Sequence, residues 1–157
     1  MLLSLSLSLS LFLLAPAAPQ SGPDEEYQFL VGLSEKGMHE LVVQEAAGFL
    51  GSYPRHEKAP SARYRLALAL FELDRLPEAL PHFQRLARRD GFEFRAEAAM
   101  RSGPCLLAGG DHGLAAASFE QVLGFQSDYL ELPATFLLGE ARFRGGDFED
   151  AEARYLR

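Results

Sequence analysis

The chain has 157 residues, of which 48% are apolar and 24% are charged, and this composition is typical of a globular protein rather than a disordered one. Its formal net charge of −7 argues against a nucleic-acid-binding protein, which normally carries a basic stripe. Because Cys105 is the single cysteine, an internal disulfide and any cysteine-based zinc site are excluded.

The N-terminus has the pattern of an export signal. Residues 2–14 form an uncharged run of leucines with interleaved serines, and this run is shorter than the roughly 20 residues that a membrane-spanning helix needs. It is followed by Ala15-Pro16-Ala17, a small-x-small cleavage pattern, and then by a flexible linker at 18–23. We therefore expect residues 1–17 to be a secretory signal peptide with Ala15 and Ala17 as its cleavage residues, and no stable membrane span after cleavage. No basic residue precedes the run, so a mispredicted start codon is the alternative.

After the linker, the sequence predicts helix pairs and no strands. The first pair covers about 24–54, with Gly37 at its turn. The next covers 60–90, with Ser61 as the N-cap of its first helix and a turn at 74–77. Two more follow at about 93–124 and 132–157, broken at 109–111 and 145–147. The last pair stops within its second helix, which indicates a piece of a longer protein or a truncated gene product.

The helix pairs repeat. A shift of 36 residues aligns small residues with small residues, aromatic residues with aromatic residues, and turn residues with turn residues. The main columns are Ala67/Gly103/Gly139, Ala79/Ala115/Ala151, Phe83/Phe119/Tyr155 and Asp74/Gly110/Gly146. Small residues at the first two columns predict a close approach of the two helices in each pair, with the aromatic residue of the third column filling the space beside the contact.

Residues 138–155 read LGEARFRGGDFEDAEARY, and this segment resembles a tetratricopeptide repeat. The resemblance covers about 24–157 and implies an all-α fold, a right-handed α-solenoid of antiparallel helix pairs with about 3.5 repeats of period 36. The unit at 93–124 departs from the family pattern, because Ser102 stands at the leucine position and Pro104 lies inside the first helix. We expect Pro104 to kink or shorten that helix.

The linking segment at 49–64 and the long period are similar to the exported bacterial subset of the family, the type of the Tol-Pal system coordinator and the outer-membrane assembly lipoprotein. The resemblance implies a non-catalytic scaffold of the periplasm or cell envelope that binds a peptide or helix of a partner protein on its concave face. By the family's geometry, the groove candidates are Tyr64, Leu68, Phe71, Met100, Leu107, Phe136, Glu140 and Phe143. The alternative is an accessory module of a longer enzyme or of a secretion or assembly component whose activity lies beyond residue 157.

The sequence offers no active site. The four histidines lack metal-ligand spacing, and Cys105 stands in a column otherwise filled by alanine, which marks it as a packing residue. The acidic cluster at 147–152 lacks the spacing of a calcium loop and suits a first helical turn. We therefore expect no enzyme, no metal and no cofactor. Only the middle third of the chain carries more basic than acidic side chains. Its arginines are Arg63, Arg65, Arg75, Arg85, Arg88 and Arg89.

Export is directly testable. We expect N-terminal sequencing of the protein from its native host to begin near Ala18, because cleavage should follow the small residues Ala15 and Ala17. Soluble cytoplasmic protein with an intact Met1 would contradict the signal-peptide assignment.

Overall fold

The structure is a computed structural model that describes residues 22–156; the apolar run at 2–14 and the cleavage residues Ala15 and Ala17 lie outside this range. Residues 22–156 form eight α-helices and no strand. The helices are α1 (Pro23–Glu35), α2 (His39–Ser52), α3 (Ala59–Glu72), α4 (Leu76–Ala87), α5 (Arg95–Ala108), α6 (His112–Gly124), α7 (Asp128–Arg144) and α8 (Phe148–Tyr155). None of these helices combines the length and the apolar character that a membrane span requires.

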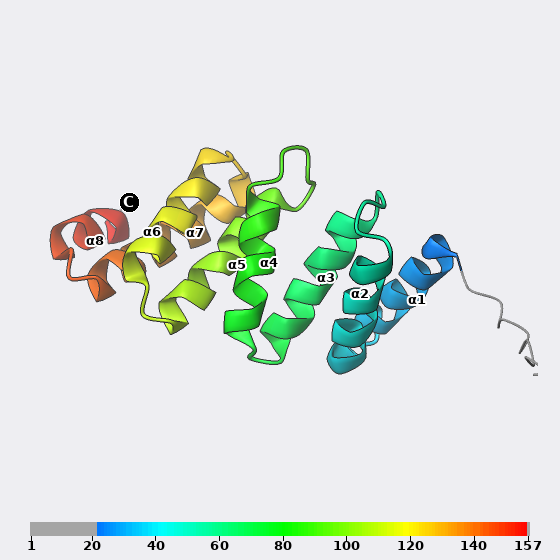
Figure 1. The fold of residues 1–157 in the computed structure, drawn as a ribbon. Coiled ribbons are helices and arrows are strands. Elements are labelled where there is room, and N and C mark those ends of the chain that lie inside the picture. The colour runs from blue at the N-terminus through cyan, green and yellow to red at the C-terminus, as the bar shows by residue number, and fades with distance from the viewer. Residues whose placement is uncertain (1–21, 157) are drawn as a thin grey trace, which may run out of the picture.

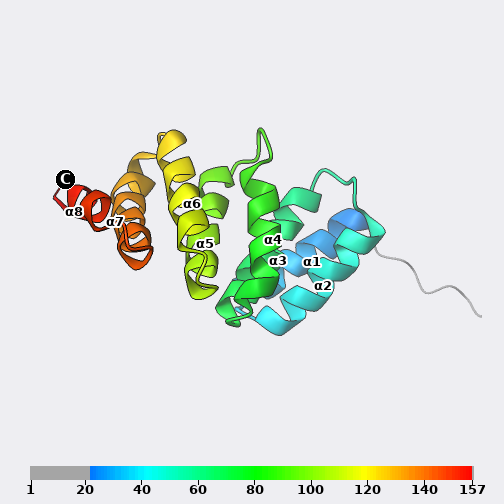
Figure 2. The same ribbon diagram turned by 60° about the vertical axis from the view of Figure 1, so that its left-hand side comes forward.

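The helices stack in sequence order into an elongated array, which confirms the expected all-α solenoid (Figure 1). We call α1, α3, α5 and α7 the A helices and α2, α4, α6 and α8 the B helices. The short turns from A to B lie along the lower edge in Figure 1, and the connections from B to A lie along the upper edge. The turned view in Figure 2 shows the same succession of neighbours from α1 to α8.

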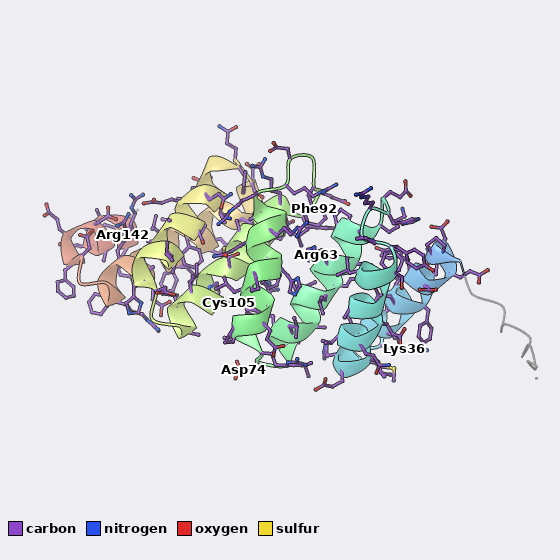
Figure 3. All side chains as sticks on the ribbon, viewed as in Figure 1. Lys36, Arg63, Asp74, Phe92, Cys105 and Arg142 are labelled. Atoms are coloured by element: carbon purple, nitrogen blue, oxygen red, sulfur yellow. The ribbon has the colours of Figure 1, made fainter. Side chains whose placement is uncertain are left out.

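Each A helix ends in the same hydrogen-bonded turn. The residue after the helix C-cap has a positive φ in all four cases: Gly37 (65°), Asp74 (58°), Gly110 (82°) and Gly146 (85°). The next amide then reaches back five residues, as in Asp111 N–H to Leu106 O at 2.9 Å and Arg75 N–H to Leu70 O at 2.8 Å. This is the Schellman motif, in which a left-handed residue satisfies the last helical carbonyls. Asp74, at the lower edge in Figure 3, is tolerated because a short polar side chain is the best substitute for glycine there.

In the last two helix pairs, the small-residue columns place an aromatic ring of the B helix against bare backbone of the A helix. A Cβ atom added to Gly103 would lie 2.2 Å from Cζ of Phe119, and one added to Gly139 would lie 3.0 Å from Cε1 of Tyr155. Phe119 is fully buried, whereas Tyr155 remains 46% exposed because no described helix packs beyond α8. The ring therefore occupies the volume that a methyl group of the A helix would take.

The first helix pair reverses this size pattern. At a spacing of 37 residues, Leu30 and Ala46 stand where the next pair has Ala67 and Phe83, and all four residues are fully buried. The large side chain thus comes from the A helix and the small one from the B helix. The exchange conserves volume in the core and explains how a divergent sequence keeps the same pairing.

Three helix ends differ from the sequence-based expectation. Helix α3 begins at Ala59 with Lys58 as its N-cap, so Ser61 lies within the first turn and is not the cap. Helix α5 continues past Pro104 to Ala108 and is not shortened, and α7 begins at Asp128 and runs through Pro133. Both prolines face the open side of the A helices, where water can solvate the carbonyls whose usual donors are missing. The expected shortening therefore does not occur.

A charge network joins the last three helices. Arg142 of α7 pairs with Glu120 of α6 at 2.7 Å and with Asp150 of α8 at 3.2 Å, and Figure 3 shows Arg142 in this region. Asp147 caps α8 by accepting the backbone N–H of Asp150 at 3.4 Å. The acidic residues of this segment thus act in capping and ion pairing, as expected for a first helical turn.

Alanine substitution should have opposite effects at a glycine that contacts a buried ring and at a glycine with open space around it. Gly103→Ala should lower the free energy of unfolding by about 1–3 kcal/mol, because the new methyl group would overlap the buried Phe119 ring. Gly48→Ala, in the exposed interior of α2 with open space at its Cβ, should raise it by about 0.5–1 kcal/mol. Urea unfolding of both variants measures this, and a Gly103→Ala protein as stable as the wild type would contradict the packing.

Candidate functional site

The A helices border an open groove of about 440 Å³. Its apolar lining comes from three helices, with one residue from α3 and the others from α5 and α7. These residues are Tyr64, Met100, Pro104, Tyr129, Leu130, Pro133 and Leu137, and the charged side chains of Glu97 and Arg101 complete the lining. The residues on α5 recur every three or four positions, a spacing that keeps them on one helix face.

Of the eight predicted groove residues, Tyr64 and Met100 line this groove. Tyr64 is held rigidly by aromatic neighbours. Its ring stacks on Phe94 with a centroid distance of 5.1 Å and an interplanar angle of 5°, and it meets Phe92 and Phe83 edge-on at 5.8 and 6.2 Å. Three of its contacts are therefore intramolecular, and only part of the ring is available to a ligand.

Three further candidates are half-buried in the core instead of lining the groove. Leu68 and Phe71 pack against the buried residues of the first three helix pairs, and Leu107 packs against those of the last two. The guanidinium group of Arg101 lies 5.1 Å from the centre of the Phe71 ring and covers it. Phe71 also meets Phe83 edge-on at 6.2 Å. Their contacts thus run mainly between neighbouring helices.

The other three candidates lie on α7, away from the groove. Phe136 is 58% exposed and its ring pairs with Tyr155 at 5.6 Å. Phe143 is 55% exposed, meets Phe148 at 5.3 Å, and lines a small apolar hollow of about 270 Å³ between α7 and α8. Glu140 pairs with Arg144 one turn further on, at 2.5 Å. The predicted set is therefore divided among the groove, the core and the end of the solenoid.

Sequence reasoning missed several groove residues because they do not recur. A shift of 36 residues aligns Tyr129 with the charged Glu93, so Tyr129 belongs to no repeated column. Pro104 was expected only to kink or shorten its helix, and Pro133 was not singled out. The signal that remained was the local density of aromatic residues just before α5 and at the start of α7.

Hydrogen bonding and burial keep the two groove phenols neutral. The Tyr129 hydroxyl donates a hydrogen bond to the Glu97 carboxylate, and this bond raises the pKa of Tyr129. Burial raises the pKa of Tyr64 to about 12. Both groups are thus uncharged at neutral pH, and Glu97 and Arg101 supply one charge of each sign at the groove.

The groove lining contains no cysteine, histidine, serine or threonine, and Cys105, the single cysteine of the chain, is buried within α5. Burial raises the pKa of the Cys105 thiol to about 11, and its Sγ lies 3.3 Å from the Arg101 carbonyl oxygen, so it is a weak nucleophile. His39 and His112 are each the half-buried first residue of a B helix. Within residues 22–156, no cluster of three or more His, Cys, Asp and Glu side chains can hold a metal ion. The geometry offers non-covalent binding.

Comparison with known proteins supports this architecture. MamA from Desulfovibrio magneticus RS-1, residues 41 to the end, has a similar structure (TM-score 0.68, 19% identity, covering 86% of this chain and 72% of that one). A double mutant of MamA RS-1 is similar too (TM-score 0.65, 24% identity, covering 84% and 72%). At these identities the likeness establishes the fold alone. No curated protein matches the sequence.

A family model described as tetratricopeptide repeat matches residues 46–94, 64–129 and 106–157. Together these matches extend without a break from residue 46 to the last residue. The chain therefore belongs to the tetratricopeptide repeat family, whose repeats serve as scaffolds for protein–protein interaction.

Proposed function

We propose that this protein is a non-catalytic interaction scaffold that binds a peptide or helix of a partner protein in the groove of α3, α5 and α7. The observation that carries this proposal is the groove itself, whose apolar lining comes from three successive A helices. Large apolar and aromatic groups of this kind are enriched in the centres of protein interfaces. Tyr129 is 65% exposed, so its ring is available to bury against a partner.

The two prolines of the groove give it a polar component. A proline has no N–H, so Pro104 and Pro133 cannot donate the helical hydrogen bonds that the carbonyls of Met100 and Tyr129 would otherwise accept. Both pairs of residues line the groove. These backbone oxygens are acceptors for N–H groups of an extended partner segment, and such main-chain contacts would fix its position along the groove.

The two charged side chains of the groove restrict which partner segments can bind there. Glu97 and Arg101 are one helical turn apart on α5, so the groove favours a segment with opposite charges at a matching spacing beside its apolar residues. We place the protein in the periplasm or cell envelope. This location is supported by the apolar run at 2–14 and the small residues that follow it, and by the resemblance to exported members of the family.

The groove is tested by two substitutions on the same helix. A partner is first isolated from envelope extract of the native host with the purified protein, and the affinity of its binding segment is then measured by calorimetry. Tyr129→Ala should weaken binding about tenfold, because truncation of an aromatic anchor typically costs 1–2 kcal/mol or more. Leu132→Ala is the matched control, since Leu132 is 77% exposed on α7 but does not line the groove. If both variants bound the segment with the affinity of the wild type, the proposal that the groove is the binding site would be wrong.

Phe71 should behave differently. Because its ring packs between Phe83 and Arg101, Phe71→Ala should lower the free energy of unfolding by about 2–3 kcal/mol and leave the affinity of the folded protein unchanged. Thermal unfolding and calorimetry on the same sample separate the two effects. A loss of affinity without a loss of stability would instead show that Phe71 contacts the partner.

A further inference from the structure

A second hollow lies between the loop that joins α2 to α3 and the C-terminal end of α4. Figure 1 shows both of these segments at the upper edge of the solenoid. It has a volume of about 420 Å³ and shares no lining residue with the groove. Its charged lining is entirely cationic: Arg55 from the loop, Arg63 from α3, and Arg85 and Arg89 from the end of α4. Half-buried His56 also lines it, and no acidic side chain does.

These four arginines lack acidic partners. None of the ion pairs among residues 22–156 includes Arg55, Arg63, Arg85 or Arg89. The remaining residues, 1–21 and 157, carry no acidic side chain that could supply a pair. Four guanidinium groups without an ion-pair partner therefore line one hollow of a protein whose net charge is −7, and the carboxylate of Asp24 lies 3.9 Å from Nε2 of His56, which also lines the hollow.

The central arginine is held by a neutral partner. Arg63, which Figure 3 shows beside α4, donates a hydrogen bond from Nη1 to Nδ1 of His82 at 3.2 Å. Burial, together with the charges of Arg63 and Arg85, lowers the pKa of His82, so its imidazole remains an uncharged acceptor. Burial and the nearby Arg85 also lower the pKa of Arg63. The contact thus orients the guanidinium group but leaves its charge available.

Helix capping explains only part of this cluster. Arg85 and Arg89 stand at the C-terminal end of α4, where cations interact favourably with the helix dipole. Arg55 and Arg63 come from other elements and have no such role. Their convergence on the same hollow brings together like charges that repel each other, and a bound anion would relieve this repulsion.

We propose that this hollow binds a phosphate dianion, either free or as a phosphomonoester. A guanidinium group matches the oxygens of phosphate and carboxylate alike, but a single planar carboxylate is satisfied by one bidentate arginine. A tetrahedral phosphate carries nearly two charges at neutral pH and offers oxygens in several directions. Arginines that approach from a loop and two helices match this second geometry better. The inference does not rest on the proposed function of the groove.

Calorimetry on the full chain at constant ionic strength tests this proposal, with inorganic phosphate as the first probe. Arg85→Gln and Arg89→Gln should each weaken phosphate binding about tenfold, because each removes charge-assisted hydrogen bonds. Arg88→Gln is the matched control: it makes the same charge change one residue away, but Arg88 faces a different hollow with Gln84 and Leu114. Arg85, Arg88 and Arg89 are all exposed, so these variants should fold normally.

Two peptides identify the source of the phosphate group. One carries phosphoserine and the other has glutamate at the same position. Tighter binding of the phosphopeptide than of inorganic phosphate places the group on a partner protein, and equal binding places it on a small molecule; both results support the proposal. Equal binding of both peptides without any binding of phosphate would overturn it in favour of a carboxylate site.

Two other results would also overturn it: no phosphate binding in the millimolar range, or an equal loss of binding in Arg88→Gln. The groove variant Tyr129→Ala should bind phosphate normally, so failure of the groove proposal and failure of this one are distinguishable.

Discussion

The contact between an aromatic ring and bare helix backbone is the constraint on which the array depends. Phe119 occupies the space where Gly103 would otherwise carry a methyl group, and this sets how closely α5 and α6 approach. Because the same columns recur every 36 residues in the last three helix pairs, and the first pair keeps the contact with the two sizes exchanged, the pairs stack on one another in a regular way. The A helices consequently come to lie along one side of the molecule (Figure 2), and the groove is a result of that alignment.

Features that recur were predictable from the sequence. The positive φ of Asp74, Gly110 and Gly146 corresponds to one column, because a repeated turn needs a left-handed residue at the same position each time. Helix ends were less predictable. Helix α7 begins at Asp128, several residues before the predicted start of its helix pair at about 132, and Pro133 lies within the helix on its groove side. Periodicity identifies the residues that all repeats share, but it gives no information about residues that occur in one repeat only.

The candidate sites depend on such additions. Tyr64 and Met100 were found because the family's geometry places them on the concave face, whereas Tyr129, Leu130 and the Phe94 ring stacked on Tyr64 were not among those candidates and became visible only in three dimensions. The arginines illustrate the same limit. Composition showed that the middle third is basic, yet it could not show that residues 34 positions apart, from Arg55 to Arg89, meet around one hollow while Arg88 faces elsewhere. Local spacing carries no information about which loop folds back onto which helix end.

Helix α3 connects the two sites, yet it keeps them separate. Arg63 and Tyr64 are adjacent in sequence, and adjacent helical residues point about 100° apart, so one faces the hollow and the other the groove. Each side chain is fixed by its own neighbours: His82 orients Arg63, and Phe92 and Phe94 enclose Tyr64. The hydrogen bond of Arg63 and the ring contacts of Tyr64 thus involve different side chains. A single helix of the repeat can in this way present an apolar surface on one side and a cationic surface on another.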